Sequence, residues 1–202
     1  TITGSLNSIE SKTATSDYSG IGNSIVGTAN RTFNSNGSII VGAGNEITNS
    51  TTAIIGAPTS GGSSAKKLAG KLRTAVKNSN GGGATMAFGG GNKADYTLRT
   101  SMIGINNTVT GADGAESADN LVMGVGNTAS NVQHLTAIGS KNTVSDAKNT
   151  VIVGDNRTVT GANNAVIIGS SDTATTTTVH DVVALGHNTD VSTEGGVALG
   201  SG

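Results

Sequence analysis

Cysteine and tryptophan are absent from this 202-residue chain, which contains one proline, two phenylalanines and two tyrosines. The lack of cysteine excludes disulfides and most zinc sites, and it leaves the redox compartment undecided. With so few large aromatic side chains, the core must be built from many small aliphatic ones. The formal net charge is -1, so the chain as a whole has no strong attraction to nucleic acid or acidic lipid. No apolar run is long enough to cross a bilayer.

Glycine is abundant, with 31 residues, but a Gly-X-Y period is missing, which excludes collagen. A different pattern recurs. Two apolar residues lead into a glycine, a polar turn follows, and another apolar residue stands five positions after the glycine. Residues 136–144, 151–159 and 165–174 show this pattern, and their glycines (Gly139, Gly154 and Gly169) are fifteen residues apart. Such a short period predicts a parallel β-solenoid with one coil per repeat.

We place the turn glycines of about twelve short coils by this pattern. The residue two positions before each of them is apolar in all twelve cases. The twelve positions are Gly4, Gly20, Gly42, Gly56, Gly89, Gly104, Gly124, Gly139, Gly154, Gly169, Gly186 and Gly200. Three intervals carry insertions, within residues 21–41, 57–83 and 105–123. Glycine suits these corners because it permits a positive φ and close approach of another backbone segment.

The two apolar residues before each glycine point to opposite faces of a strand. Ile152 and Val153 are an example, so the strand must be buried on both faces. One face fills the inside of the coil against the strand that carries Val159. The chain supplies no obvious cover for the other face, which predicts a symmetric oligomer. Asparagine recurs three residues after the glycine, and stacked asparagines can bond from coil to coil; the asparagines concerned are Asn7, Asn23, Asn45, Asn92, Asn107, Asn127 and Asn142.

The longest insertion, residues 57–83, forms an inserted arm with glycine- and serine-rich flanks. Its apolar residues at positions 68, 72, 75 and 76 follow helical spacing, while Gly70 weakens a helix and leaves a β-hairpin as the competitor. The arm holds five of the twelve basic residues and no acid. It either packs as a cap or strap on a neighbouring chain or contacts a ligand directly. The candidate ligand-binding residues are Lys66, Lys67, Lys71, Arg73 and Lys77.

The repeats at residues 136–140, 164–169 and 196–201 resemble the head repeats of YadA-like trimeric autotransporter adhesins, and the resemblance covers nearly the whole chain. It implies an all-β, left-handed parallel β-roll that assembles as a homotrimer. It also implies a place on the cell surface of a Gram-negative bacterium, with outer-membrane anchoring through missing C-terminal parts. Heads of this family bind matrix proteins, host cells or neighbouring bacteria. We therefore expect residues 1–202 to be a single head domain from a longer chain, without enzymatic activity, cofactor, metal or nucleic-acid partner.

Two other functions stay open. A carbohydrate-active β-solenoid enzyme would need two or three acids close together on one face, and the thirteen carboxylates are scattered along the sequence. An ice-binding solenoid is suggested by the threonines at 175–178, but these form one local run instead of a ladder over many coils. A flat, evenly spaced threonine array would favour it. His134, His180 and His187 lack metal-ligand spacing and are expected in turns or at the surface.

Overall fold

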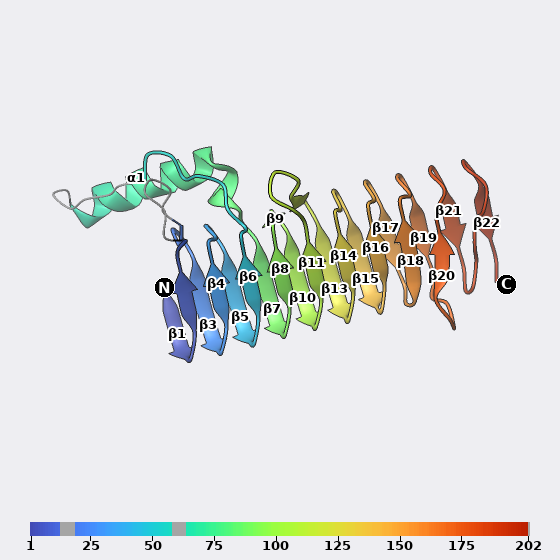
Figure 1. The fold of residues 1–202 in the computed structure, drawn as a ribbon, viewed down its shortest axis with the longest axis horizontal. Coiled ribbons are helices and arrows are strands. Elements are labelled where there is room, and N and C mark those ends of the chain that lie inside the picture. Colours follow the sequence, from blue (N-terminus) through green and yellow to red (C-terminus); the bar gives the residue numbers. More distant parts are fainter. Residues whose placement is uncertain (13–18, 58–63, 202) are drawn as a thin grey trace.

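A computed structural model describes residues 1–12, 19–57 and 64–201 of the chain. Two long parallel sheets run side by side along one axis, and the chain alternates between them to build a parallel β-roll (Figure 1). We call them sheet A and sheet B. The predicted all-β solenoid is confirmed, with a single long helix added by the inserted arm within the described residues.

Sheet A has eleven strands and sheet B has nine, and all neighbouring pairs are parallel. The strands of sheet A are, in order, β1 (Ile2–Ser5), β3 (Ser24–Thr28), β5 (Ile39–Ala43), β7 (Met86–Gly90), β10 (Ser101–Ile105), β13 (Leu121–Val125), β15 (Thr136–Ser140), β17 (Val151–Val153), β19 (Val166–Ile168), β21 (Val183–Leu185) and β22 (Val197–Leu199). Those of sheet B are β2 (Ser8–Glu10), β4 (Arg31–Phe33), β6 (Glu46–Thr48), β8 (Lys93–Asp95), β11 (Thr108–Thr110), β14 (Thr128–Ser130), β16 (Thr143–Ser145), β18 (Arg157–Thr160) and β20 (Thr175–Thr177). A third, short pair joins β9 (Thr97–Leu98) to β12 (Ser117–Ala118).

The core lies between the two sheets and is formed by the inward side chains of both. Ile152 from β17 and Val159 from β18 are both completely buried, as predicted. Equivalent residues of neighbouring coils stack on these two because the strands pair in parallel register. They all point inward because side chains along a strand alternate between its two faces. The inward residues of sheet A are Ile25, Ile40, Ala87, Met102, Val122, Ala137, Ile152, Ile167 and Ala184.

A ladder of glycines follows the end of sheet A. Each has a positive φ, and a Cβ built on Gly139 would overlap the carbonyl oxygen of Gly154 in the next coil. The ladder corrects two of the twelve predicted positions. Gly27, which pairs with Gly42, takes the place of Gly20, and Gly56 lies in a turn outside the ladder, where an added Cβ would meet nothing. Sheet A therefore has eleven strands, and the first insertion falls between β2 and β3 instead of within residues 21–41.

An asparagine ladder lies inside the corner between the two sheets, confirming that stacked asparagines bond from coil to coil. The side-chain nitrogen of Asn127 donates to Asn107 Oδ1 (2.9 Å) and to the carbonyl oxygen of Gly139 (2.7 Å). Asn127 Oδ1 in turn accepts from the backbone and side-chain nitrogens of Asn142, both at 3.0 Å. The members are Asn7, Asn30, Asn45, Asn92, Asn107, Asn127 and Asn142. Asn23 was wrongly assigned to this column; it stands before β3 and bonds to Thr32 and Ser35.

Arg157 replaces the next asparagine and is 1% exposed. Its Nε donates to the carbonyl oxygen of Gly169 (2.7 Å), the contact that an asparagine would make. Its terminal nitrogens reach one coil further, to the carbonyl oxygens of Thr189 (2.6 Å) and Gly186 (3.1 Å). Burial of the guanidinium lowers the pKa of Arg157 from its ordinary value, with the charge of Asp190 acting in the opposite direction.

The segments that follow the strands of sheet B, which include β9 and β12, stack into a third wall of the roll, and the residues of this wall that point inward change in kind along the axis. In the N-terminal half its inward residues carry hydroxyls, and Ser50 Oγ lies 2.7 Å from Thr97 Oγ1. In the C-terminal half the same wall presents Val132, Ala147 and Ala162, all buried. This wall therefore passes from hydrogen-bonded to apolar, while the core between the two sheets is apolar in both halves.

The inserted arm contains helix α1 (Ala65–Asn78), which decides between the helix and the hairpin in favour of the helix. Ser64 caps its first turn, and the 3-10 helix η1 (Asn80–Gly82) follows it. Thr52 N donates to Gly82 O (2.9 Å) and Arg99 N donates to Gly83 O (2.6 Å), which returns the chain to the roll. No helix among the described segments has both the length and the apolar character needed to cross a membrane.

Candidate functional site

Helix α1 carries all five basic residues predicted to contact a ligand. Figure 1 shows the helix lying along the direction of the roll axis, with its C-terminal part beside the coils of β1, β3 and β5 and its N-terminal part extending past β1. Its apolar residues follow one face: Ala75 is buried, and Leu68, Leu72 and Val76 are partly buried. The charged side chains are exposed; they are Lys66, Lys67, Lys71, Arg73 and Lys77. None of the five takes part in an ion pair within the described part of the chain.

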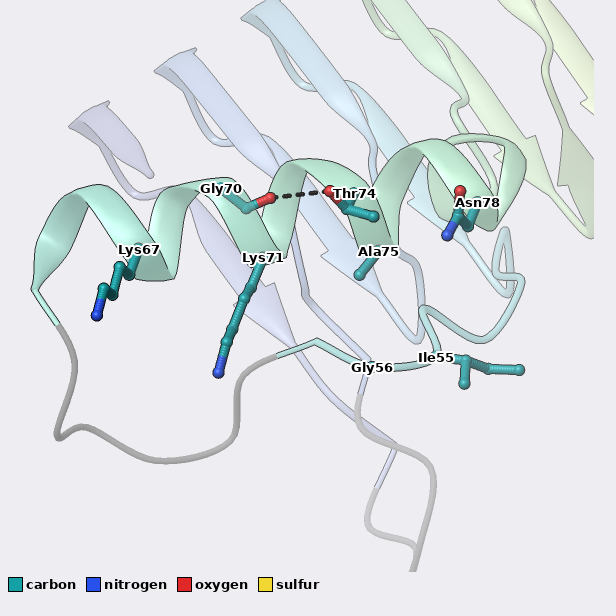
Figure 2. A pocket seen from close by; sticks show the side chains of 8 residues that line it. All are labelled: Ile55, Gly56, Lys67, Gly70, Lys71, Thr74, Ala75 and Asn78. Atoms are coloured by element: carbon teal, nitrogen blue, oxygen red, sulfur yellow. Dashed lines mark hydrogen bonds between the residues drawn. The ribbon is translucent and has the colours of Figure 1, made fainter.

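A groove of about 680 Å³ separates α1 from the segment that enters the arm. Lys67 and Lys71, one helical turn apart, extend from the same side of α1, and Gly56 and Ile55 lie on that side beneath the C-terminal part of the helix (Figure 2). Thr74 lies on the same flank, and its hydroxyl donates to the carbonyl oxygen of Gly70 (3.1 Å). No acidic residue is found among the described residues that line this groove. The structure thus brings two of the five predicted residues together and distributes the other three along the opposite flank of the helix.

The outer face of sheet A presents an uninterrupted apolar column. Val153 is 39% exposed although its neighbours above and below, Ile138 and Ile168, are also apolar. The column runs in register through the sheet and consists of Val26, Val41, Phe88, Ile103, Met123, Ile138, Val153, Ile168, Leu185 and Leu199. Single exposed apolar residues are ordinary, but a contiguous apolar patch marks an interaction surface.

The outer face of sheet B is charged in its N-terminal half. Arg31 bridges Glu10 and Glu46 at 2.9 Å each, and its guanidinium lies 5.1 Å from the centre of the Phe33 ring. The hydrogen bonds from Arg31, with a further one from Ser8, lower the pKa of Glu10 to about 2. The side chains of Arg31, Glu10 and Glu46 are 35–43% exposed, so solvent screens the network and its contribution to the stability of the fold is small.

The C-terminal half of the same face carries hydroxyls instead. The strand register aligns Thr108, Thr128, Thr143, Thr158 and Thr176 in one column. A second column, two residues further along each strand, contains Thr110, Ser130, Ser145 and Thr160. The sequence-based expectation that threonines form only a local run at 175–178 is therefore wrong. Unequal coil lengths hid a ladder that extends over five coils.

The remaining titratable groups do not converge on a centre. Among the described residues, no group of three or more His, Asp or Glu side chains could hold a metal ion. His187 Nε2 lies 3.1 Å from Asp172 Oδ1 at the surface, and His180 Nδ1 accepts from Asn163 N (3.0 Å). His134 occupies a turn with a positive φ. Hydrogen bonds from Asn188 and then from His187 lower the pKa of Asp172.

Sequence reasoning missed Arg157 and the hydroxyl columns. A lone arginine in an asparagine column was the available signal for the first, and the repeated Thr-X-Thr or Thr-X-Ser pattern in residues 108–160 was the signal for the second. Comparison of the chain with protein-family models, curated proteins and solved structures finds no match.

Proposed function

We propose that this chain is the non-enzymatic head of a cell-surface adhesin, a homotrimeric β-roll that attaches bacteria to host matrix, host cells or one another. The observation that carries the proposal is the apolar column on the outer face of sheet A. No helical layer is described over this face of the single chain. Its ten stacked apolar side chains are therefore exposed or half-exposed to water. Burial of that area against identical chains supplies the stability that one thin solenoid lacks.

Three copies around a common axis would place the apolar columns together and turn the sheet B faces and the α1 helices outward. The sequence resemblance to YadA-like heads favours three copies over two. A trimer with an exposed, stiff surface binds by many weak contacts, because the second and third contacts form at a high effective concentration. Such a head would be held at the outer membrane of a Gram-negative bacterium through other parts of a longer chain.

The mass of the particle in solution tests this proposal. Light scattering should give three chains for the native protein, while Val153→Arg should give single chains or unfolded protein. Thr143→Arg adds the same charge to the outer face of sheet B and is the matched control, which should remain trimeric. A native protein that is folded and monomeric would overturn the proposal, as would a trimer unaffected by Val153→Arg.

The hydroxyl columns favour a second candidate function, the binding of ice. Adjacent coils repeat at about 4.8 Å. Tetrahedral water with hydrogen bonds of about 2.75 Å places second-neighbour oxygens about 4.5 Å apart. Centred on Thr143, the mismatch reaches only about 0.6 Å at the outermost of five coils by these spacings. None of the five first-column hydroxyls is hydrogen-bonded within the described chain, and the intervening residues such as Val144 point into the core.

This second candidate is tested by ice growth. The native protein should inhibit recrystallisation of ice, and Thr143→Tyr in the middle of the array should abolish the effect. Lys93→Tyr, on the same face outside the array, should leave it unchanged. Ice growth indistinguishable from that in serum albumin would reject ice binding and leave the adhesin proposal intact. The carbohydrate-active enzyme lacks an observation in its favour.

A further inference from the structure

The charge of this molecule is divided between two parts. Helix α1 carries five Lys and Arg residues, and the arm of residues 57–83 contains no acid. The rest of the chain holds seven Lys and Arg against thirteen Asp and Glu, a formal net charge of -6 (7 - 13). A net charge of -1 therefore conceals a strongly basic helix on an acidic roll. The helix attracts anions that the roll repels.

The basic side chains line both flanks of the helix. Lys67 and Lys71 border the groove together with Ile55 and Gly56, and none of the described residues that line it is acidic (Figure 2). On the other flank, Arg73 and Lys77 border a second hollow of about 490 Å³. Positive charges consequently border both hollows along the length of α1.

The spacing of the positive charges along α1 suits a ligand that is an extended chain of anionic groups. From Lys66 to Lys77 the helix rises about 16 Å at 1.5 Å per residue, and a positive charge occurs in every turn. On the second flank Arg73 and Lys77 stand beside the half-buried Leu72 and Val76, so this side of the helix offers apolar surface next to its cations. A compact ligand would meet only one or two of these cations, whereas a linear polyanion meets all of them.

We propose that α1 and its groove bind an anionic polysaccharide, carboxylated or sulfated. The chemistry favours this class over other polyanions. The arm contains no aromatic residue, and single-stranded nucleic acids are held mainly by stacking of bases on aromatic side chains. Protein interfaces depend on buried aromatic or arginine anchors in pockets, and these flanks are open and rich in lysine. Hydroxyl-rich sugar chains can also use Thr74 and Asn78, which line the groove beside the two lysines.

This inference names a ligand class for the proposed adhesin head, and it rests on that function for its biological meaning. Three copies of α1 in a trimer would multiply weak ionic contacts. The helix belongs to a single chain, however, so binding itself can be measured whatever the number of chains. Failure of the inference and failure of the adhesin proposal are therefore separate results.

The experiment measures binding of the native protein to heparin as a function of salt concentration. Lys67→Gln/Lys71→Gln removes the two groove cations, and glutamine keeps the helix propensity of lysine. Lys93→Gln/Lys148→Gln removes two exposed cations from the roll and is the matched control. The groove variant should bind about tenfold more weakly. Its log-log salt dependence should also fall by about 1.5, since each lost contact lowers the slope by about 0.7–0.9.

Three results would overturn the inference: no binding of heparin by the native protein, equal losses in the two double variants, or tighter binding of duplex DNA of equal charge than of heparin. Light scattering on the same samples reports the number of chains. A trimer that ignores heparin contradicts only the polysaccharide site, and a monomer that binds heparin contradicts only the assembly.

Discussion

Replacement of Arg157 by alanine should be among the most damaging single changes in this protein. The guanidinium donates to carbonyl oxygens of the next two coils, at Gly169, Gly186 and Thr189. Gly186 O keeps another donor, the hydroxyl of Thr189 (2.9 Å). The other two oxygens lose a charged donor, at about 1–3 kcal/mol each. With the cavity that the side chain leaves, Arg157→Ala should cost about 3–5 kcal/mol.

Two further variants separate the possible causes. Arg157→Asn restores the amide donor that every other member of the ladder offers to the next coil, so it should recover about 2 kcal/mol relative to alanine. Arg157→Met fills the space without a donor and should remain close to alanine if the carbonyl contacts dominate.

Urea unfolding at one fixed protein concentration measures these differences. At an m-value of about 2 kcal/mol/M, the alanine variant should lose about 2 M in midpoint. A loss below 1 kcal/mol would show that the buried charge offsets its own contacts. A methionine variant as stable as the native protein would refute the argument from the carbonyl oxygens.

Three other predictions concern the ladders and the surface charge network. Gly139→Ala should destabilise the protein by more than Gly200→Ala, because both have a strongly positive φ but only the Cβ at Gly139 would overlap a neighbouring coil; thermal unfolding of the two variants measures the difference, and equal effects would contradict the overlap. The carboxyl of Glu10 should titrate near pH 2 in an NMR experiment, and Arg31→Gln should return its pKa toward the ordinary value of about 4.3. Since the folded-state pKa is depressed, this contribution to stability is complete above about pH 5 and disappears as the pH falls through 2. Asn127→Leu should cost about 2–4 kcal/mol, because it removes an amide that donates twice and accepts twice inside the roll; a loss below 1 kcal/mol in urea would show that the ladder is incidental.

The fold could be predicted from the sequence because each coil repeats the same physical requirements. The apolar pair, the glycine and the asparagine three residues later can all be recognised within a single repeat of the sequence. That last signal could have excluded Gly56, but it could not separate Gly27 from Gly20. Gly27 is followed by Asn30, whereas Gly56 is followed by Thr59 at the same distance, and Gly20 by Asn23 only by coincidence. The fifteen-residue pattern alone did not separate true corners from nearby glycines.

Other features depend on distances between coils and could not be predicted from one repeat. Arg157 contacts the second coil after its own, and an alignment of the repeats does not reveal contacts between coils that are not neighbours. The hydroxyl ladder needs the register of Thr108 with Thr128 and of Thr158 with Thr176, where the coils differ in length. For the candidate site, helical spacing favoured one helix for the five cations but left a β-hairpin open, and the groove between Lys67, Lys71 and Gly56 required the path of the segment that enters the arm.

The change inside the roll from hydroxyls to aliphatic side chains has a consequence for temperature. Around Ser50 and Thr97 the coils are joined by buried hydrogen bonds, whereas around Val132 and Ala147 they are joined by apolar contact. Apolar contact loses strength on cooling, because the driving force for its burial falls with temperature. Cooling should therefore weaken the third wall more in its C-terminal coils than in its N-terminal ones, while the apolar core between the two sheets is common to both halves of the rod.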